Sequence, residues 1–185
     1  TEQCRHRRGL TDGSAVYKIE LLMKQLGLTS ESRTVVRPAL EVAARTDAPA
    51  AAMEMPDGKI LTGKTSSLLG SSSALLLNAL KYLGGIPDEV HLITPEVIEP
   101  VQNLKVNVLG NKNPLLHIDE LLVALSICAV SDPNAKQAVR QLQKLRGCEV
   151  HTTVILSQSD EDSFRRLGVR LTSEPTYQTS KLYHK

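Results

Sequence analysis

The sequence predicts an α/β protein in which a mixed sheet lies between layers of helices, preceded by a short helical segment. Two observations carry this prediction. Two short strand-like runs flank a Pro-Asp-Gly turn, which indicates a β-hairpin. Helices and single strands then alternate, which is typical of a sheet covered on both faces. The 185 residues suit one domain with an appendage. We expect residues 1–47 to form a helical remnant of a larger protein and residues 48–185 to form the α/β domain.

The first part of the chain contains two predicted helices. Residues 13–27 place five apolar side chains on one helical face, namely Val16, Ile19, Leu22, Met23 and Leu26. Pro38 can open the second helix, over residues 39–45. The basic cluster at residues 5–8 is local, and we interpret it as a solvated segment or a contact with missing sequence.

A predicted hairpin pairs residues 51–55 with residues 59–62 across Met55-Pro56-Asp57-Gly58. The same stretch contains a literal G-x-x-x-x-G-K-T, which ends at Thr65 and is the pattern of a phosphate loop. A phosphate loop needs flexible residues inside the motif, whereas Ile60 and its neighbours are typical of strands. We therefore favour the hairpin over a nucleoside-triphosphate site.

A Gly/Ser-rich turn follows the hairpin and leads into an apolar helix predicted over residues 72–83. Ser71 or Ser72 is the expected N-cap, and Gly84-Gly85 ends the helix. Free N–H groups and a partial positive charge at a helix N-terminus can bind an anion. Two interpretations stay open: the serines only cap the helix, or they form an anion pocket with Lys64, which lies just upstream.

Local signals predict the remaining elements in chain order. Thr94-Pro95 marks one helix start, and Pro100 interrupts the helix that follows. The expected elements are a strand over 90–93, a helix from 94 to 109, a loop over 110–114, helices over 117–130 and from 132, a strand over 148–156, a helix over 159–167 and a strand over 169–172. We expect His91 to be a hydrogen-bonded core residue.

The composition excludes several classes of function. The net charge is +2 and aromatic residues make up 3% of the chain, which argues against a base-stacking nucleic-acid surface. We expect no nucleic-acid partner. The sequence has no apolar run of membrane length, so we expect no membrane contact. Three cysteines without C-x-x-C spacing fit a reducing compartment rather than a disulfide framework. No motif identifies a cofactor.

The order of elements resembles the cytidine-deaminase-like fold, in which a hairpin leads to a helix that carries half of a zinc site. That chemistry needs a His- or Cys-x-Glu at one helix start and a Pro-Cys-x-x-Cys at the next. Here those places hold Ser72-Ser73-Ala74 and Thr94-Pro95-Glu96. We therefore expect no zinc and no deaminase activity.

A second resemblance covers nearly the whole chain. Segments such as PDGKILTGKTSSLLGSSSALLLNALK, LGNKNPLLHIDELLVALSIC and EPTYQTSKLYHK resemble the C-terminal part of a large bacterial family of unknown function, one of the UPF/DUF groups. Members of that family are much longer and carry an N-terminal α/β domain. The resemblance implies a fragment of a cytoplasmic bacterial protein. It implies no catalytic residues, because the family has no established activity.

Two functions are therefore considered. The first is an enzyme, or the substrate-binding part of one, that binds a phosphorylated or nucleotide-like small molecule at helix N-termini. His117 is its candidate acid or base. The candidate ligand-binding residues are Lys64, Thr65, Ser66, Ser71, Ser72, Thr94, Asn111 and Lys112.

The second function is a structural module in which apolar helices over 74–83 and 117–130 form a homo-oligomer interface. In that case the active site lies in a missing N-terminal domain that contacts this chain. Convergence of Lys64, Ser72, Lys112 and His117 on one pocket would favour the first function, and their dispersal would favour the second.

Overall fold

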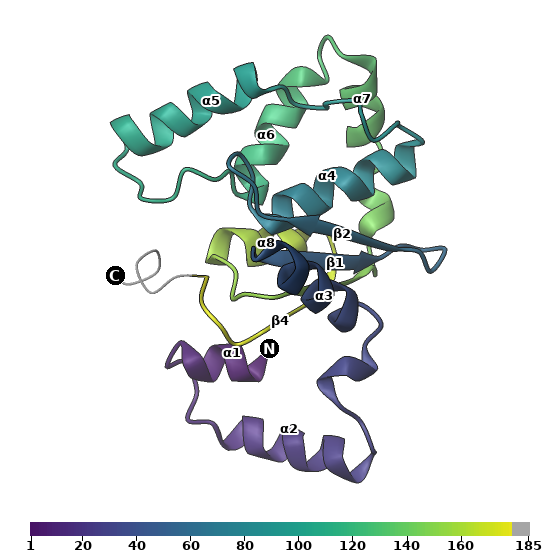
Figure 1. The fold of residues 1–185 in the computed structure, drawn as a ribbon, viewed down its shortest axis with the longest axis vertical. Helices are drawn as coiled ribbons and strands as arrows, with labels where there is room; N and C mark the ends of the chain where they lie inside the picture. The colour runs from purple at the N-terminus through teal and green to yellow at the C-terminus, as the bar shows by residue number, and fades with distance from the viewer. Residues whose placement is uncertain (179–185) are drawn as a thin grey trace.

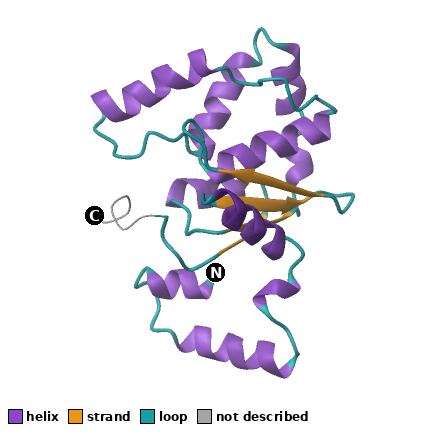
Figure 2. Ribbon diagram, in the orientation of Figure 1, coloured by secondary structure: helices purple, strands orange, loops and turns teal. Residues whose placement is uncertain are grey.

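The computed structural model describes residues 1–178, so residues 179–185 of the expected α/β domain lie outside it. Within this range the chain forms a four-stranded mixed sheet and eight α-helices (Figures 1 and 2). The α/β class is confirmed. The elements are α1 (Glu2–Arg7), α2 (Ser14–Gln25), α3 (Val36–Thr46), β1 (Ala50–Glu54), β2 (Ile60–Lys64), α4 (Ser71–Gly84), α5 (Pro95–Asn103), α6 (Ile118–Cys128), α7 (Pro133–Val139), β3 (Glu149–Thr152), α8 (Gln158–Arg166) and β4 (Arg170–Ser173).

The sheet has the strand order β2-β1-β3-β4. Strand β1 is antiparallel to both β2 and β3, and β4 is parallel to β3. Strands β2, β3 and β4 therefore run in one direction, and their carboxyl ends meet at one edge of the sheet. The predicted hairpin is confirmed, with Ala51 opposite Gly63 and a positive φ of 84° at Gly58 in the turn. Because residues 60–64 are a strand, the motif ending at Thr65 does not form a phosphate loop.

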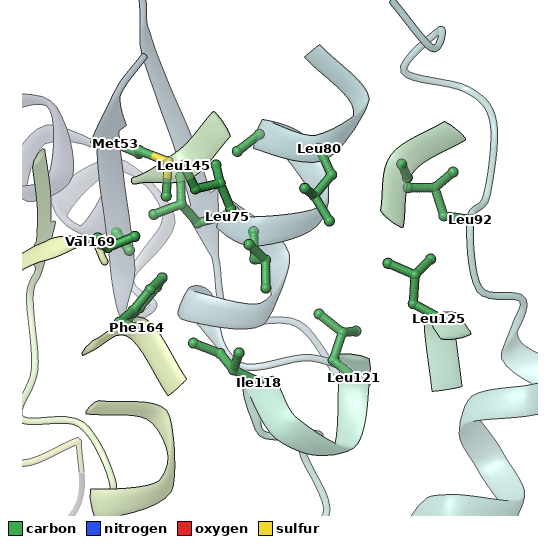
Figure 3. Close-up of a cluster of buried hydrophobic side chains, with 14 of the residues drawn as sticks. Met53, Leu75, Leu80, Leu92, Ile118, Leu121, Leu125, Leu145, Phe164 and Val169 are labelled. Carbon is green, nitrogen blue, oxygen red and sulfur yellow. The ribbon is translucent and has the colours of Figure 1, made fainter. Parts of the chain in front are cut away.

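Helices cover both faces of the sheet, so the expected three layers are confirmed. Met53 of β1 points into the main core, which α4, α6 and α8 enclose (Figure 3). Ala52, its neighbour in β1, points to the opposite face and packs against Val35 and Ala39 at α3. The alternation of side chains along β1 thus buries both of its faces. Helix α7 packs outside, against α4 and α6.

Strand β2 and helix α4 approach each other unusually closely at Gly63. A Cβ atom on Gly63 would lie 2.3 Å from the backbone nitrogen of Leu75, which leaves no room for any side chain. The missing side chain therefore lets α4 lie directly on the sheet. This contact fixes where the N-terminal turn of α4 lies relative to the strand ends.

Two expected strands differ from the structure. The strand over 90–93 is wrong: Leu92 and Ile93 are buried, but the segment packs on helices and pairs with no described strand. An apolar run can meet the core without joining a sheet, so burial alone does not make a strand. His91 is exposed, and the expected core position is wrong. The strand over 148–156 is shorter than expected, because the chain leaves the sheet after Thr152.

Helices α1 and α2 lie beyond the sheet from α4 (Figure 1). Helix α1 was not predicted from the sequence. Arg8 at its C-terminal end attaches it to α8, because the guanidinium binds both carboxylate oxygens of Glu161 at 2.8 and 3.1 Å. Arg8 also donates to the carbonyl of Leu156 at 2.6 Å.

Helix α3 packs on the sheet, so the first 47 residues include part of the helical layer that covers it. The division of the chain at residue 47 stays a prediction. No helix in the described range could cross a membrane.

Candidate functional site: a pocket at the N-terminus of α4

A small pocket lies where the chain leaves the carboxyl end of β3 and meets the N-terminus of α4. Its enclosed volume is about 30 Å³. One water needs roughly 10–15 Å³ on this measure, so the pocket suits one small chemical group. Three segments distant in sequence, helix α8 and Gln178 form the wall. The residues are Gly70, Ser71, Ser72, Ser73, Asn113, Leu115, Leu116, His117, Val154, Ile155, Leu156, Asp160 and Gln178.

The first turn of α4 presents unpaired N–H groups to this pocket. The N-cap is Gly70, so the expectation that Ser71 or Ser72 caps the helix is wrong. Glycine has no side chain with which to accept from the helix. The backbone N–H groups of Ser71, Ser72 and Ser73 accordingly donate to no acceptor within residues 1–178. Together with the helix dipole, they make this end of α4 locally positive.

The serine hydroxyls in this turn have different surroundings. Ser73 donates to the carbonyl of Leu116 at 2.9 Å and so ties α4 to the segment before α6. Ser72 is only 3% exposed, and its hydroxyl has no hydrogen-bond partner in the described part of the chain. An unsatisfied buried hydroxyl costs about 1–3 kcal/mol, so most such groups are paired. The Ser72 hydroxyl is therefore available to a group that enters the pocket.

His117 stands on the other side of the pocket, as the N-cap residue of α6. Its Nδ1 lies 3.0 Å from Asp160 Oδ2 and 3.2 Å from Ser157 Oγ. Ser157 in turn donates to Asp160 Oδ2 at 2.9 Å. A serine, a histidine and an aspartate are the residue types of a catalytic triad. Here, however, Ser157 and Asp160 both contact the same imidazole nitrogen, Nδ1, and the Ser157 hydroxyl donates its proton to Asp160. Ser157 therefore caps α8 and is not an activated nucleophile.

The protonation of His117 is coupled to Asp160. The hydrogen bond to this carboxylate raises the pKa of His117, against the opposing effect of burial. Asp160 Oδ1 accepts from the backbone N–H of Ile118 at 2.8 Å, so both carboxylate oxygens are occupied. A protonated His117 donates from Nδ1 to Asp160. Its Nε2–H has no acceptor within the described residues and can donate to a bound anion.

A buried lysine holds the segment before α6 in place. Lys105 Nζ donates to the carbonyl of Leu115 and to Glu120 Oε2, both at 2.7 Å. Glu120 also accepts from the backbone N–H of His117 at 2.8 Å. Lys105 does not line the pocket. Lys105 therefore positions His117 indirectly, through Glu120 and the carbonyl of Leu115.

Comparison with known proteins places the chain in a family. Residues 31–183 match the family model described as "Domain of unknown function DUF1846, C-terminal". The chain belongs to the DUF1846 family. It is 52% identical over 179 residues to a UPF0371 protein of Corynebacterium efficiens, an alignment that covers 97% of this chain and 36% of that protein. A UPF0371 protein of Clostridium tetani is 41% identical over 189 residues, which is 98% of this chain and 38% of the relative. The chain thus spans little more than a third of the length of these bacterial relatives, as the resemblance to longer proteins implied.

The structure of this DUF1846 domain brings together three of the residues singled out from the sequence. Ser71, Ser72 and His117 line one pocket, whereas Lys64 and Lys112 are exposed outside its lining. The other four candidates also lie outside the lining. Thr65 bonds through its N–H to the carbonyl of Pro49, the Ser66 hydroxyl accepts from Leu68 and Leu69, Thr94 precedes α5, and Asn111 accepts from the N–H of Asn113.

Sequence reasoning missed the contribution of α8. The helix was expected from Ser159, but Ser157 is its N-cap and Asp160 is at its third position. The sequence contains Ser-x-x-Asp over residues 157–160, a pattern that indicates a helix N-cap. That pattern locates the cap. It does not reveal that Asp160 also meets His117, which lies 43 residues earlier in the chain.

Proposed function

We propose that this DUF1846 domain binds the anionic group of a small molecule, such as a phosphoryl group, at the N-terminus of α4. The observation that carries the proposal is the buried Ser72 hydroxyl, which has no hydrogen-bond partner among residues 1–178 and lies beside three N–H groups of the same helix turn that are also unpaired within that range. All of these backbone groups are donors, and an anion offers only acceptors. Their chemistry is therefore complementary.

Two features supply positive charge at this site. The helix dipole contributes roughly half a positive charge at this end of α4. His117 adds a full positive charge when protonated, and that charge is partly balanced by Asp160. The enclosed volume of about 30 Å³ suits the anionic group alone. The remainder of a phosphorylated or nucleotide-like molecule would extend outside the pocket.

The described geometry supports binding rather than a chemical step. No hydroxyl or thiol lining the pocket within residues 1–178 is hydrogen-bonded to a histidine that could take its proton. We therefore propose that His117 donates a hydrogen bond to the ligand when its imidazole is protonated. We assign a catalytic role to no residue of this domain.

Calorimetric titration of the full-length protein with sulfate and with a nucleoside monophosphate tests the proposal. Sulfate keeps its charge between pH 5 and 9, so any pH dependence belongs to the protein. Loss of a hydrogen bond to a charged group costs about 1.5–3 kcal/mol, so Ser72→Ala should weaken binding at least about tenfold. Lys64→Ala is the matched control outside the lining and should change affinity little.

The pH profile gives an independent readout. Binding should weaken as the pH rises through the raised pKa of His117, because deprotonation removes the Nε2–H donor, whereas the Nδ1–H stays on the imidazole and donates to Asp160. His117→Gln should flatten this profile. Sulfate binding that is absent in the parent protein, or equal in Ser72→Ala, would refute the proposed site.

A further inference from the structure

Helix α2 is amphipathic, yet it buries no side chain. Ile19, Leu22 and the C-cap residue Leu26 follow one another at intervals of three and four residues and so share one face of the helix. They are 42%, 56% and 71% exposed. Helix α1 is the main neighbour of α2 within residues 1–178 (Figure 1). Helices of this length derive most of their stability from packing an apolar face, so the exposed face needs a partner.

The position of α2 in the family indicates which partner. The match to the C-terminal domain covers residues 31–183 and so excludes α2. The alignment with the Corynebacterium efficiens protein covers 97% of this chain, which leaves out too few residues to omit α2. Helix α2 is thus shared with full-length relatives but lies outside their C-terminal domain. Because this chain is 36% of that relative's length, most of the remainder precedes residue 1.

We propose that the face of α2 formed by Ile19, Leu22 and Leu26 docks onto the part of the full-length protein that precedes residue 1. The exposed polar side chain of Lys18 lies beside the apolar face on the helix and supplies part of the rim that such interfaces have. The α4 pocket does not involve α2, so this inference is independent of the proposed function.

Hydrogen–deuterium exchange on the full-length protein tests the docking. In the wild type the amides of α2 should be protected to a degree similar to those of a packed helix. Leu22→Glu should remove that protection while α4 stays protected. Val123→Glu is the matched control, because Val123 on α6 is 63% exposed and lies on another helix. It should leave the exchange of α2 unchanged.

Two outcomes would overturn the inference. Free exchange of α2 in the wild-type full-length protein would show that its face has no partner. Protection seen only in a dimer, and lost when Leu22→Glu converts the dimer to a monomer in sedimentation, would identify a second copy as the occupant instead. Leu26→Ala, a milder change at the end of α2, should lower the protection partially and keeps the test informative if Leu22→Glu does not fold.

Discussion

Replacing Ser72 by alanine should stabilise the protein and weaken its ligand binding at once. The Ser72 hydroxyl is buried and has no partner in the described chain, so folding removes it from water without compensation. Such a group costs about 1–3 kcal/mol. Alanine removes that cost and leaves little empty space, and we expect the free energy of unfolding to rise by about 1 kcal/mol.

Ser73→Ala provides the matched comparison. Both serines lie in the first turn of α4, so the change in helix propensity is similar for the two. The Ser73 hydroxyl, however, donates to the carbonyl of Leu116 at 2.9 Å. Its loss leaves a buried carbonyl without a partner, and we expect the free energy of unfolding to fall by about 1–3 kcal/mol.

Urea unfolding followed by circular dichroism measures both variants. A difference of at least about 2 kcal/mol between them corresponds to roughly 4–8 °C in Tm for a chain of this size. If Ser72→Ala lost as much stability as Ser73→Ala, the Ser72 hydroxyl would have a structural partner. The argument that it is available to a ligand would then be refuted.

Three further predictions follow from other contacts. Gly63→Ala should lower the free energy of unfolding in urea by about 3 kcal/mol, because its Cβ would lie 2.3 Å from the backbone nitrogen of Leu75; an unchanged midpoint would contradict the close packing of β2 on α4. Burial, with a contribution from a nearby arginine, lowers the pKa of His151 from its ordinary 6.5 to about 4 and outweighs the Glu174 carboxylate, which lies 3.1 Å from His151 Nε2. The unfolded state therefore binds more protons than the folded state between pH 4 and 6.5, so stability should fall as the pH drops through this window, and less so in His151→Gln; parallel profiles would contradict this. Asp160→Asn should move the midpoint of sulfate binding to lower pH, since the Asp160 carboxylate raises the pKa of His117; an unmoved midpoint in the titration would show that another group controls binding.

Local chemistry made the hairpin and several helix ends predictable. Pro-Asp-Gly requires a tight turn, and Gly58 has the positive φ that glycine tolerates. Thr94-Pro95 correctly predicted the start of α5, and Gly85 ends α4 in a left-handed conformation. Each of these signals depends only on residues that are close in sequence, so it can be recognised from the sequence alone.

Pairing in a sheet is not a local property, and the failed strand shows why. Residues 90–93 have strand composition, and two of them are buried. A strand also needs a neighbour with free backbone groups. The strands with a free side are β2 and β4, and residues 90–93 pair with neither, so the segment that precedes α5 contributes side chains to the core without entering the sheet.

The pocket could be anticipated only in part for a related reason. Ser72 and His117 were candidates because each lies at a helix start, and that much can be read locally. Their meeting depends on strand direction: β2 and β3 are both antiparallel to β1, so their carboxyl ends lie at one edge of the sheet. The turn into α4 leaves from one of those ends and residues 154–156 leave from the other. Close packing at Gly63 then brings the first turn of α4 onto that edge, so a residue that does not line the pocket helps to set its geometry.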